Sequence, residues 1–175
     1  MKKTIFISIF ILMFSTTMMF AGDPGKKSVK YCDVQQFMTD YYTAYNLYSQ
    51  DASTIDLMDR YWAPEFLSIQ FLPIPQPLVM DRTTWKYFLV GVHSQFIETL
   101  TVEEMSIDTQ KLTVVARLTI DMTDRASGVL VLRIGGVGFY NLKVDKKKNL
   151  QMICLKLYFS DPGALMALSG PPPGM

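Results

Sequence analysis

The apolar positions of this chain follow a helical period in three segments of its first hundred residues. Over 34–49 they recur every three or four residues on one stripe, and the same spacing returns over 53–61, shortly before Pro64. A third stripe begins after Asp81, a residue type that caps helix starts, and continues to about residue 98. The pattern predicts a long helix, a short helix and a third helix.

The period shifts towards two after the third segment, as is typical of strands. Polar or glycine-bearing breaks divide this region into four predicted strands, over 101–109, 111–122, 128–144 and 149–159. One earlier strand is predicted over 66–72, before a loop in which three prolines prevent regular pairing. Sequential strands pair most simply with their neighbours, so we expect the last four to form an antiparallel meander.

Alternation along the strands indicates which face of the sheet is buried. On two strands the apolar side consists of Leu112, Val114, Ala116, Leu118 and Ile120, and of Ile153, Leu155, Leu157 and Phe159. The helices must cover this side, which predicts an α+β domain with three amino-terminal helices packed on a strongly curved, mainly antiparallel sheet. Gly135, Gly136 and Gly138 lie within one strand, where they favour a bulge and a bend.

The first residues carry the pattern of a secretory signal peptide. Lys2 and Lys3 precede an apolar run over 5–14, and Ala21 suits the last position before cleavage. The run is shorter than the roughly 20 residues that a membrane-spanning helix needs, so a cleaved signal over 1–21 is favoured over a permanent anchor. We therefore expect export to the periplasm or the extracellular space, without stable membrane insertion after cleavage.

The rest of the chain divides by composition into three parts. Residues 22–32 hold glycine, proline and lysine with few apolar side chains, so we expect a flexible leader. The patterned region over 33–161 forms one domain. Residues 162–175 form a tail rich in proline and glycine, with one short packed turn at most.

Charge and cysteine content narrow the possible partners. The chain has 17 basic and 16 acidic residues, and this near-neutral balance does not favour nucleic acid. Cys32 and Cys154 leave two possibilities open, a disulfide in an oxidising compartment or a free pair with Cys154 inside an apolar strand. One histidine and two distant cysteines cannot supply the usual zinc ligands, and we expect neither a metal nor another cofactor.

The order of the predicted elements and three local features carry a family resemblance. These features are the run Trp62-Ala63-Pro64-Glu65-Phe66, Asp81 at the start of the third helix, and the final strand with Met152-Ile153-Cys154-Leu155-Lys156-Leu157. Over about residues 33–161 the chain resembles the nuclear transport factor 2-like superfamily, and its SnoaL-like members most. The resemblance implies a cone-shaped, cystatin-like roll that encloses a pocket, usually in a homodimer joined through the sheet. Members include steroid isomerases, polyketide cyclases, dehydratases and non-enzymatic binding modules, so the resemblance does not decide the function.

Candidate pocket residues come from the helices and from the first strand. The expected ligand-binding set is Tyr41, Tyr45, Trp62, Ser68, Gln70, Trp85 and His93. Aromatic residues at helical spacing are also typical of a core, and that interpretation is favoured here. His93 is the one histidine and a weak catalytic candidate; with no assignable carboxylate partner, we expect it to be a partly exposed helix residue.

The expected function follows from the absence of an acid–base pair among the candidate pocket residues. Without an assignable acid–base pair, the leading hypothesis is an exported, non-enzymatic domain that binds a small apolar ligand or a protein partner. The alternative is an isomerase, cyclase or dehydratase acting on a small hydrophobic carbonyl compound, with His93 as base and Tyr41 or Tyr45 polarising the oxygen. A third hypothesis is a structural dimer that recruits an envelope partner through its charged sheet face. The charged outer stripe of this face consists of Arg117, Asp121, Arg133 and Lys156, and the favoured interpretation of the stripe is a solvated surface with weak ion pairs.

Overall fold

The structure is a computed structural model, and it describes residues 29–169 of the chain. The predicted signal peptide, most of the predicted leader and the end of the predicted tail lie outside these residues. Within the described range, no helix combines the length and the apolar character needed to cross a membrane.

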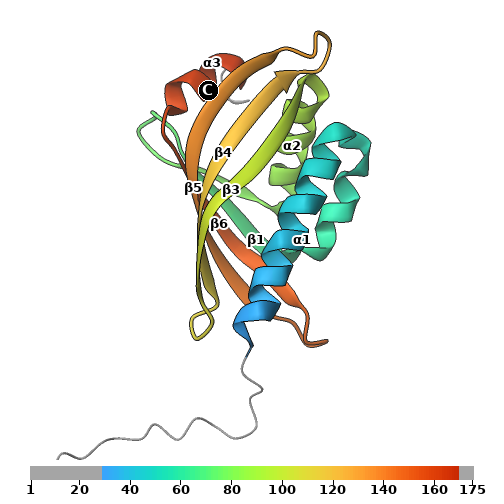
Figure 1. The fold of residues 1–175 in the computed structure, drawn as a ribbon, viewed down its shortest axis with the longest axis vertical. Coiled ribbons are helices and arrows are strands. Elements are labelled where there is room, and N and C mark those ends of the chain that lie inside the picture. Colours follow the sequence, from blue (N-terminus) through green and yellow to red (C-terminus); the bar gives the residue numbers. More distant parts are fainter. Residues whose placement is uncertain (1–28, 170–175) are drawn as a thin grey trace, which may run out of the picture.

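A six-stranded, strongly curved sheet forms the larger part of the domain (Figure 1). The strands are β1 Trp62–Phe71, β2 Leu78–Asp81, β3 Phe96–Asp108, β4 Thr113–Asp124, β5 Leu130–Val144 and β6 Leu150–Phe159. Their order in the sheet is β2-β1-β6-β5-β4-β3. The last four strands form the expected antiparallel meander, whereas β1 runs parallel to β6.

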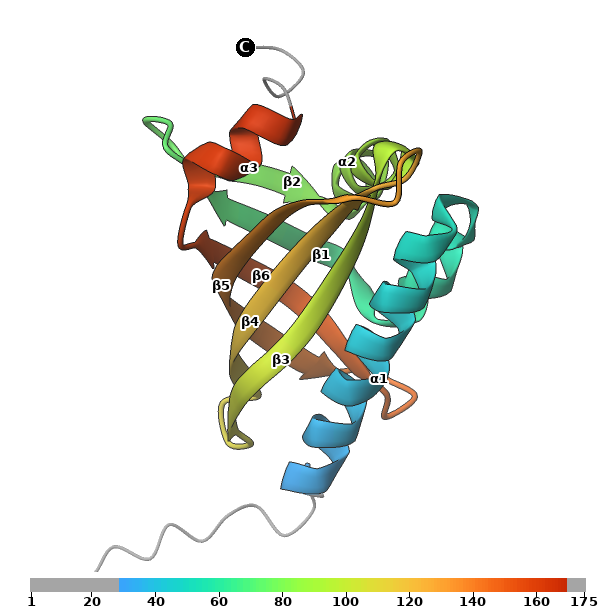
Figure 2. The same cartoon turned by 45° about the horizontal axis from the view of Figure 1, so that its top comes forward.

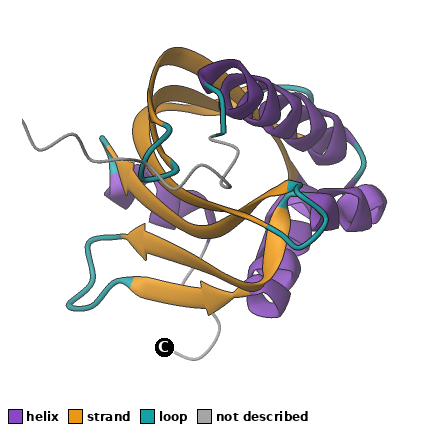
Figure 3. Ribbon diagram, turned by 90° about the horizontal axis from the view of Figure 1, so that it is seen from below, coloured by secondary structure: helices purple, strands orange, loops and turns teal. Residues whose placement is uncertain are grey.

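Three helices close the concave side of this sheet, as predicted. They are α1 Tyr31–Gln50, a 3-10 helix (η1) Ala52–Arg60, and α2 Arg82–Gln95. Figure 3 shows the sheet curling around the interior and the helices lying across its open side. The α+β class and the cone-like shape are therefore confirmed.

The helix boundaries differ from the predicted ones at two places that matter. The chain is already helical from Tyr31, so the predicted leader ends too late; Asp33 stabilises this start by accepting a hydrogen bond from the Lys30 backbone N–H at 3.3 Å. Helix α2 ends at Gln95, not near residue 98, because Phe96 turns extended while its N–H still bonds the Val92 carbonyl. The residues after Gln95 therefore belong to β3.

The strand predictions were incomplete around β1. This strand begins at Trp62, ahead of the predicted start, and Pro64 lies within it where the register against β6 shifts between Trp62 and Leu67. Residues 78–81 were not predicted as a strand, yet they pair with β1 as the edge strand β2. Asp81 has the predicted capping role, accepting a hydrogen bond from the Thr84 N–H at 2.8 Å.

The buried face of the sheet follows the predicted alternation with local exceptions. Val114, Ala116, Leu118 and Ile120 are buried as expected, but Leu112 lies in the preceding turn with φ of 51°. On β6 a register shift places Met152 in the core in place of Ile153. The register shifts of β5 lie away from its three glycines, so the bulge predicted there is wrong.

The carboxyl-terminal segment is more ordered than the sequence suggested. Where one short turn was the most expected, α3 spans Pro162–Ser169. Figure 2 shows α3 at the end of the molecule where α2 and β2 also lie. Leu165 of α3 packs against the core, so this segment belongs to the folded domain.

Candidate functional site

A cavity of about 50 Å³ lies between the helices and the concave face of the sheet. Its wall consists of Tyr41, Tyr45, Gln70, Trp85, Phe88, Leu89, Val92, Glu98, Leu100, Leu118, Ile120, Met122, Tyr140, Leu155, Leu157, Phe159 and Leu165. Most of these side chains are aliphatic or aromatic, and the polar groups are few. Ligand pockets commonly have this composition, in which a small number of polar groups orient an otherwise apolar molecule.

Glu98 supplies the charged group of this wall. Its carboxylate oxygen Oε2 accepts a hydrogen bond from the Tyr45 hydroxyl at 2.8 Å and lies 2.9 Å from His93 Nε2. The side chain of Glu98 is 15% exposed. Its other oxygen, Oε1, makes no hydrogen bond or ion pair within residues 29–169. One carboxylate oxygen is thus fixed by the protein, and the other can accept a hydrogen bond from a bound molecule.

The junction between α2 and β3 places Glu98 at the cavity. Arg125 joins the ends of two helices here, since its guanidinium donates to the backbone carbonyls of Ser49, Gln50 and His93 at distances between 2.6 and 3.0 Å. A cation at helix carboxyl ends satisfies carbonyls that have no partner inside the helix. Arg125 therefore holds α1 and α2 together on either side of the first residues of β3.

Side chains of α1 attach the edge strand β3 directly. The Asn46 amide donates to the Leu100 carbonyl at 2.9 Å and accepts from the Leu100 N–H at 2.8 Å, as a neighbouring strand would. The Ser49 hydroxyl donates to the Glu98 carbonyl at 2.5 Å. These bonds give partners to the Leu100 N–H and to the Leu100 and Glu98 carbonyls on the open edge of β3, and they fix the backbone that carries Glu98.

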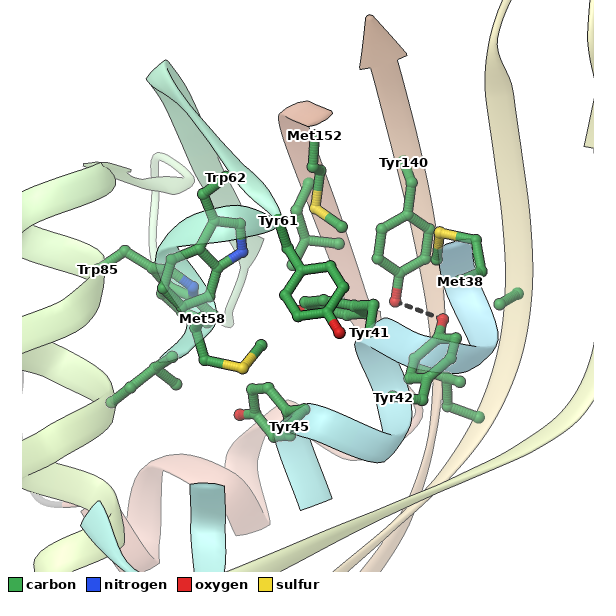
Figure 4. Close-up of a cluster of buried hydrophobic side chains, with 14 of the residues drawn as sticks. Met38, Tyr41, Tyr42, Tyr45, Met58, Tyr61, Trp62, Trp85, Tyr140 and Met152 are labelled. Atoms are coloured by element: carbon green, nitrogen blue, oxygen red, sulfur yellow. Dashed lines mark hydrogen bonds between the residues drawn. The ribbon is translucent and has the colours of Figure 1, made fainter. Parts of the chain in front are cut away.

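A group of buried tyrosines, most of them on α1, lies beside the cavity and contributes Tyr41, Tyr45 and Tyr140 to its wall; these three are labelled in Figure 4. This tyrosine cluster consists of Tyr41, Tyr42, Tyr45, Tyr48 and Tyr140. Burial raises the pKa of each hydroxyl far above its ordinary value, and for Tyr45 the nearby Glu98 carboxylate raises the pKa further. The cluster consequently stays protonated at any physiological pH and offers hydroxyl donors.

His93 differs from its predicted environment. It is fully buried, and it has a carboxylate partner, Glu98, so the expectation of a partly exposed histidine without such a partner is wrong. Its ring packs against Tyr45 and Tyr48, with centroid distances of 5.6 and 4.9 Å. Its Nδ1 has no hydrogen-bond partner among the described residues. A proton on Nε2 allows the ring to donate to the Glu98 carboxylate.

The predicted pocket residues divide into two groups. Tyr41, Tyr45, Gln70 and Trp85 line the cavity. Trp62, Ser68 and His93 are fully buried but do not belong to its wall. Ligand binding by any of the seven stays a prediction, and His93 reaches the cavity only through Glu98.

Glu98 itself was missed from the sequence. The third helical stripe was extended to about residue 98, which placed this acid at a helix end. The signal was the alternation of Phe96, Glu98 and Leu100 on one face of a strand, which brings the carboxylate to the same side as the core. Tyr140 was also missed, although it alternates with Gly138 and Leu142 on the inner face of β5.

The part of the chain that the structure describes contains neither a metal-binding group of side chains nor a disulfide. Residues 29–169 contain no group of three or more histidine, cysteine or acidic side chains that could hold a metal ion. Both cysteines are free, Cys32 exposed on α1 and Cys154 half-buried in β6. Of the two possibilities left open by the sequence, the structure has the free pair. The chemistry that the cavity offers is hydrogen bonding and proton transfer at Glu98.

Comparison with known proteins supports the fold. No protein-family model matches the sequence, and no curated protein matches it. Among solved structures, the chain is similar to a putative SnoaL-like polyketide cyclase from Jannaschia sp. CCS1, with a TM-score of 0.59 and 16% identity over 86% of this chain and 100% of that one. It is also similar to a putative polyketide cyclase from Xanthomonas campestris pv. campestris, with a TM-score of 0.59 and 14% identity over 79% and 98% of the two chains.

A third solved structure, a ketosteroid isomerase-like protein from Erwinia carotovora atroseptica, has a TM-score of 0.52. It is 14% identical over 74% of this chain and 95% of that one. At such identities the likeness shows a common fold and leaves the chemistry of the cavity to be argued from its own residues.

Proposed function

We propose that this chain, which has the nuclear transport factor 2-like fold in its SnoaL-like form, binds a small, mainly apolar molecule through one hydrogen-bonding group. The observation that carries the proposal is the carboxylate of Glu98 in an otherwise apolar wall, with Oε2 held by Tyr45 and His93 and Oε1 unpaired. A ligand that donates a hydrogen bond to Oε1 gains affinity and a fixed orientation in the otherwise apolar cavity.

The size of the cavity limits the ligand. A volume of about 50 Å³ accommodates a few water molecules, since one water needs about 10–15 Å³. An apolar cavity of about 150 Å³ can bind benzene. A ligand of that size requires side chains of the wall to move, and Leu165 on the short helix α3 is the wall residue closest to the chain end.

Binding is tested by nuclear magnetic resonance titration with small aromatic alcohols and amines. Val92→Phe fills the cavity from α2, and the matched control Val131→Phe adds the same ring at an exposed position. We expect the cavity-filling variant to weaken binding by at least about tenfold, while the control leaves it unchanged. Equal affinity in both variants, with both folded, would contradict the cavity as the binding site.

A second candidate function is proton transfer on a carbonyl compound, and the free Oε1 of Glu98 favours it. In this case Glu98 is the base, and the donor for the carbonyl oxygen is Tyr140, a wall residue whose hydroxyl accepts from Tyr42 and keeps its own proton to donate. His93 then serves as a positioning residue, because its Nε2 is bonded to Glu98 and it does not line the cavity. The test is exchange of solvent deuterium into the α-carbon of a small cyclic ketone; Glu98→Gln must abolish it, and unchanged exchange would exclude this function.

Export and pairing through the sheet complete the proposal. Export is supported by the signal-peptide pattern over 1–21. Pairing is supported by three aromatic side chains on the outer face of the sheet. The ring centroid of Tyr158 lies 4.1 Å from that of Phe71, in a stacked pair, and 5.5 Å from that of Phe139, in an edge-to-face pair; Phe139 and Tyr158 are 39% and 40% exposed. The charged residues Asp121 and Arg133 pair with each other on this face at 2.6 Å.

A further inference from the structure

The charge of the cavity wall is negative and is carried by one residue. Glu98 is the charged member of the wall, which otherwise consists of aliphatic, aromatic and amide side chains. Within residues 29–169, no lysine or arginine lies within 4.0 Å of its carboxylate. A carboxylate with 15% of its side chain exposed has lost most of its hydration and keeps its charge only if other groups compensate for that loss.

The neighbours of Glu98 stabilise its charge without neutralising it. Tyr45 donates a neutral O–H, since burial holds its pKa far above the ordinary value. His93 Nε2 lies 2.9 Å from Oε2 of Glu98, the oxygen that accepts the Tyr45 bond, and its Nδ1 has no hydrogen-bond partner among the described residues. The nearby Arg125 directs its guanidinium to four hydrogen bonds with backbone carbonyls of α1 and α2. Both hydrogen bonds fall on Oε2, which leaves Oε1 of the carboxylate as the acceptor at the cavity.

Aromatic side chains share the cavity wall with this carboxylate. The aromatic members of the wall are Tyr41, Tyr45, Trp85, Phe88, Tyr140 and Phe159. Aromatic ring faces attract a cation that lies within about 6 Å. Transfer of a cation from water into a cavity with aromatic walls therefore costs less free energy than transfer into an aliphatic cavity. A carboxylate beside several aromatic rings forms a site in which a cation finds both a counter-charge and favourable ring faces.

From this combination we infer that the hydrogen-bonding group of the ligand is a protonated amine, so that the cavity takes a small apolar ammonium compound. The inference rests on the proposed function and names the chemical class of the ligand. The ammonium group donates to Oε1 of Glu98, and the apolar part lies among the aliphatic residues of the wall, such as Leu118 and Leu157. A carboxylate ligand would meet a like charge at Glu98, and an alcohol would make only a neutral donor's bond.

Three probes with the same ring separate these classes: benzylamine, benzyl alcohol and benzoate. Binding of each to the full mature chain is followed by nuclear magnetic resonance titration at pH 7. A hydrogen bond between charged partners is about twice as strong as a neutral one, and we expect benzylamine to bind about tenfold more tightly than benzyl alcohol, with benzoate weakest.

Two variants on β3 locate the effect. Glu98→Gln removes the charge from the cavity and must erase the preference for the amine, bringing the two dissociation constants within about twofold of each other. Glu104→Gln is the matched control, because it makes the same change on the same strand at a side chain that is 75% exposed. The control must keep the wild-type preference.

A measurement on the wild-type chain makes the test independent of whether Glu98→Gln folds. The carboxylate carbon resonance of Glu98 must shift on addition of benzylamine more than on addition of benzyl alcohol. Equal affinity for amine and alcohol, with the Glu98 carboxylate shifted by both, would overturn the inference and leave the proposed function standing. A Glu98 carboxylate that no probe shifts would overturn both. If none of the three probes binds at millimolar concentration, the proposed function fails as well.

Discussion

The buried hydrogen bond between Tyr42 and Tyr140 predicts that losing one hydroxyl destabilises the fold more than losing both. The two hydroxyl oxygens lie 2.7 Å apart and join α1 to β5 across the core (Figure 4). Tyr42 is 5% exposed and Tyr140 is 1% exposed, so both side chains are almost fully removed from bulk solvent. Replacing one tyrosine by phenylalanine therefore leaves the other hydroxyl unpaired, whereas replacing both removes the polar pair.

The magnitudes follow from the cost of an unpaired buried group. Each single variant, Tyr42→Phe or Tyr140→Phe, should lower the free energy of unfolding by about 1–3 kcal/mol, since one hydroxyl remains without a partner. The double variant should lose only about 1 kcal/mol in total, because its two buried groups are apolar and almost the same size as before. The double variant is thus expected to be more stable than at least one of its parents.

Equilibrium unfolding in urea measures this cycle. We expect the slope with denaturant to be the same in all four proteins, so that midpoints report stability directly. The coupling between the two positions, the sum of the single losses minus the loss of the double variant, should be about 1–5 kcal/mol. Single variants that each cost less than about 0.5 kcal/mol, or a double variant whose loss equals the sum of the singles, would refute the reasoning.

Three further predictions concern a glycine, the tyrosine cluster and the outer face of the sheet. Gly138→Ala should lower the thermal midpoint, since its Cβ would lie 2.5 Å from the Tyr140 hydroxyl. In Gly91→Ala on α2 the added Cβ meets no atom within 4 Å, and this variant should raise the free energy of unfolding by about 0.5–1 kcal/mol. Above pH 10 the free energy of unfolding should fall, by up to about 1.4 kcal/mol per pH unit for each cluster tyrosine, in a urea series at increasing pH. The proposed pairing through the sheet predicts a dimer for the wild-type chain and a monomer for Phe139→Glu in light scattering, because the charge would be buried in the interface.

The sign of the pH effect follows from linkage. The folded-state pKa of each cluster tyrosine is raised by burial, so between the unfolded value near 10 and the folded value only the unfolded chain loses its proton. The contribution is complete below pH 10 and is lost as the pH rises through the folded pKa. Phenolate absorbance from the cluster before unfolding would contradict this account. A stabilised Gly138→Ala or an unchanged mass for Phe139→Glu would contradict the other two predictions.

The sheet and its buried face could be predicted because strand alternation is a local property. Each residue from Val114 to Ile120 reports its own side of the sheet, and no distant contact is needed to interpret it. The edge strand β2 could not be predicted in this way. Its four residues become a strand only by pairing with β1, and proline residues precede them.

The candidate site was harder to predict because it depends on where one helix ends. The predicted third helix continues to about residue 98, which places His93 and Glu98 on the same helix. In that arrangement His93 has no carboxylate partner. In the structure, the extended backbone from Phe96 returns the Glu98 carboxylate to His93 across the junction. That turn is fixed by Arg125, which is distant in sequence and bonds the last carbonyls of both helices. Contacts of this kind have no period along the chain.

A crystal structure of the mature chain grown with benzylamine tests the central claim most directly. The account predicts the aromatic ring inside the cavity, with the nitrogen within about 3 Å of Oε1 of Glu98 and the Tyr45 bond to Oε2 preserved. An amine found only on the surface, or a ring in the cavity with its nitrogen turned away from Glu98, would contradict it.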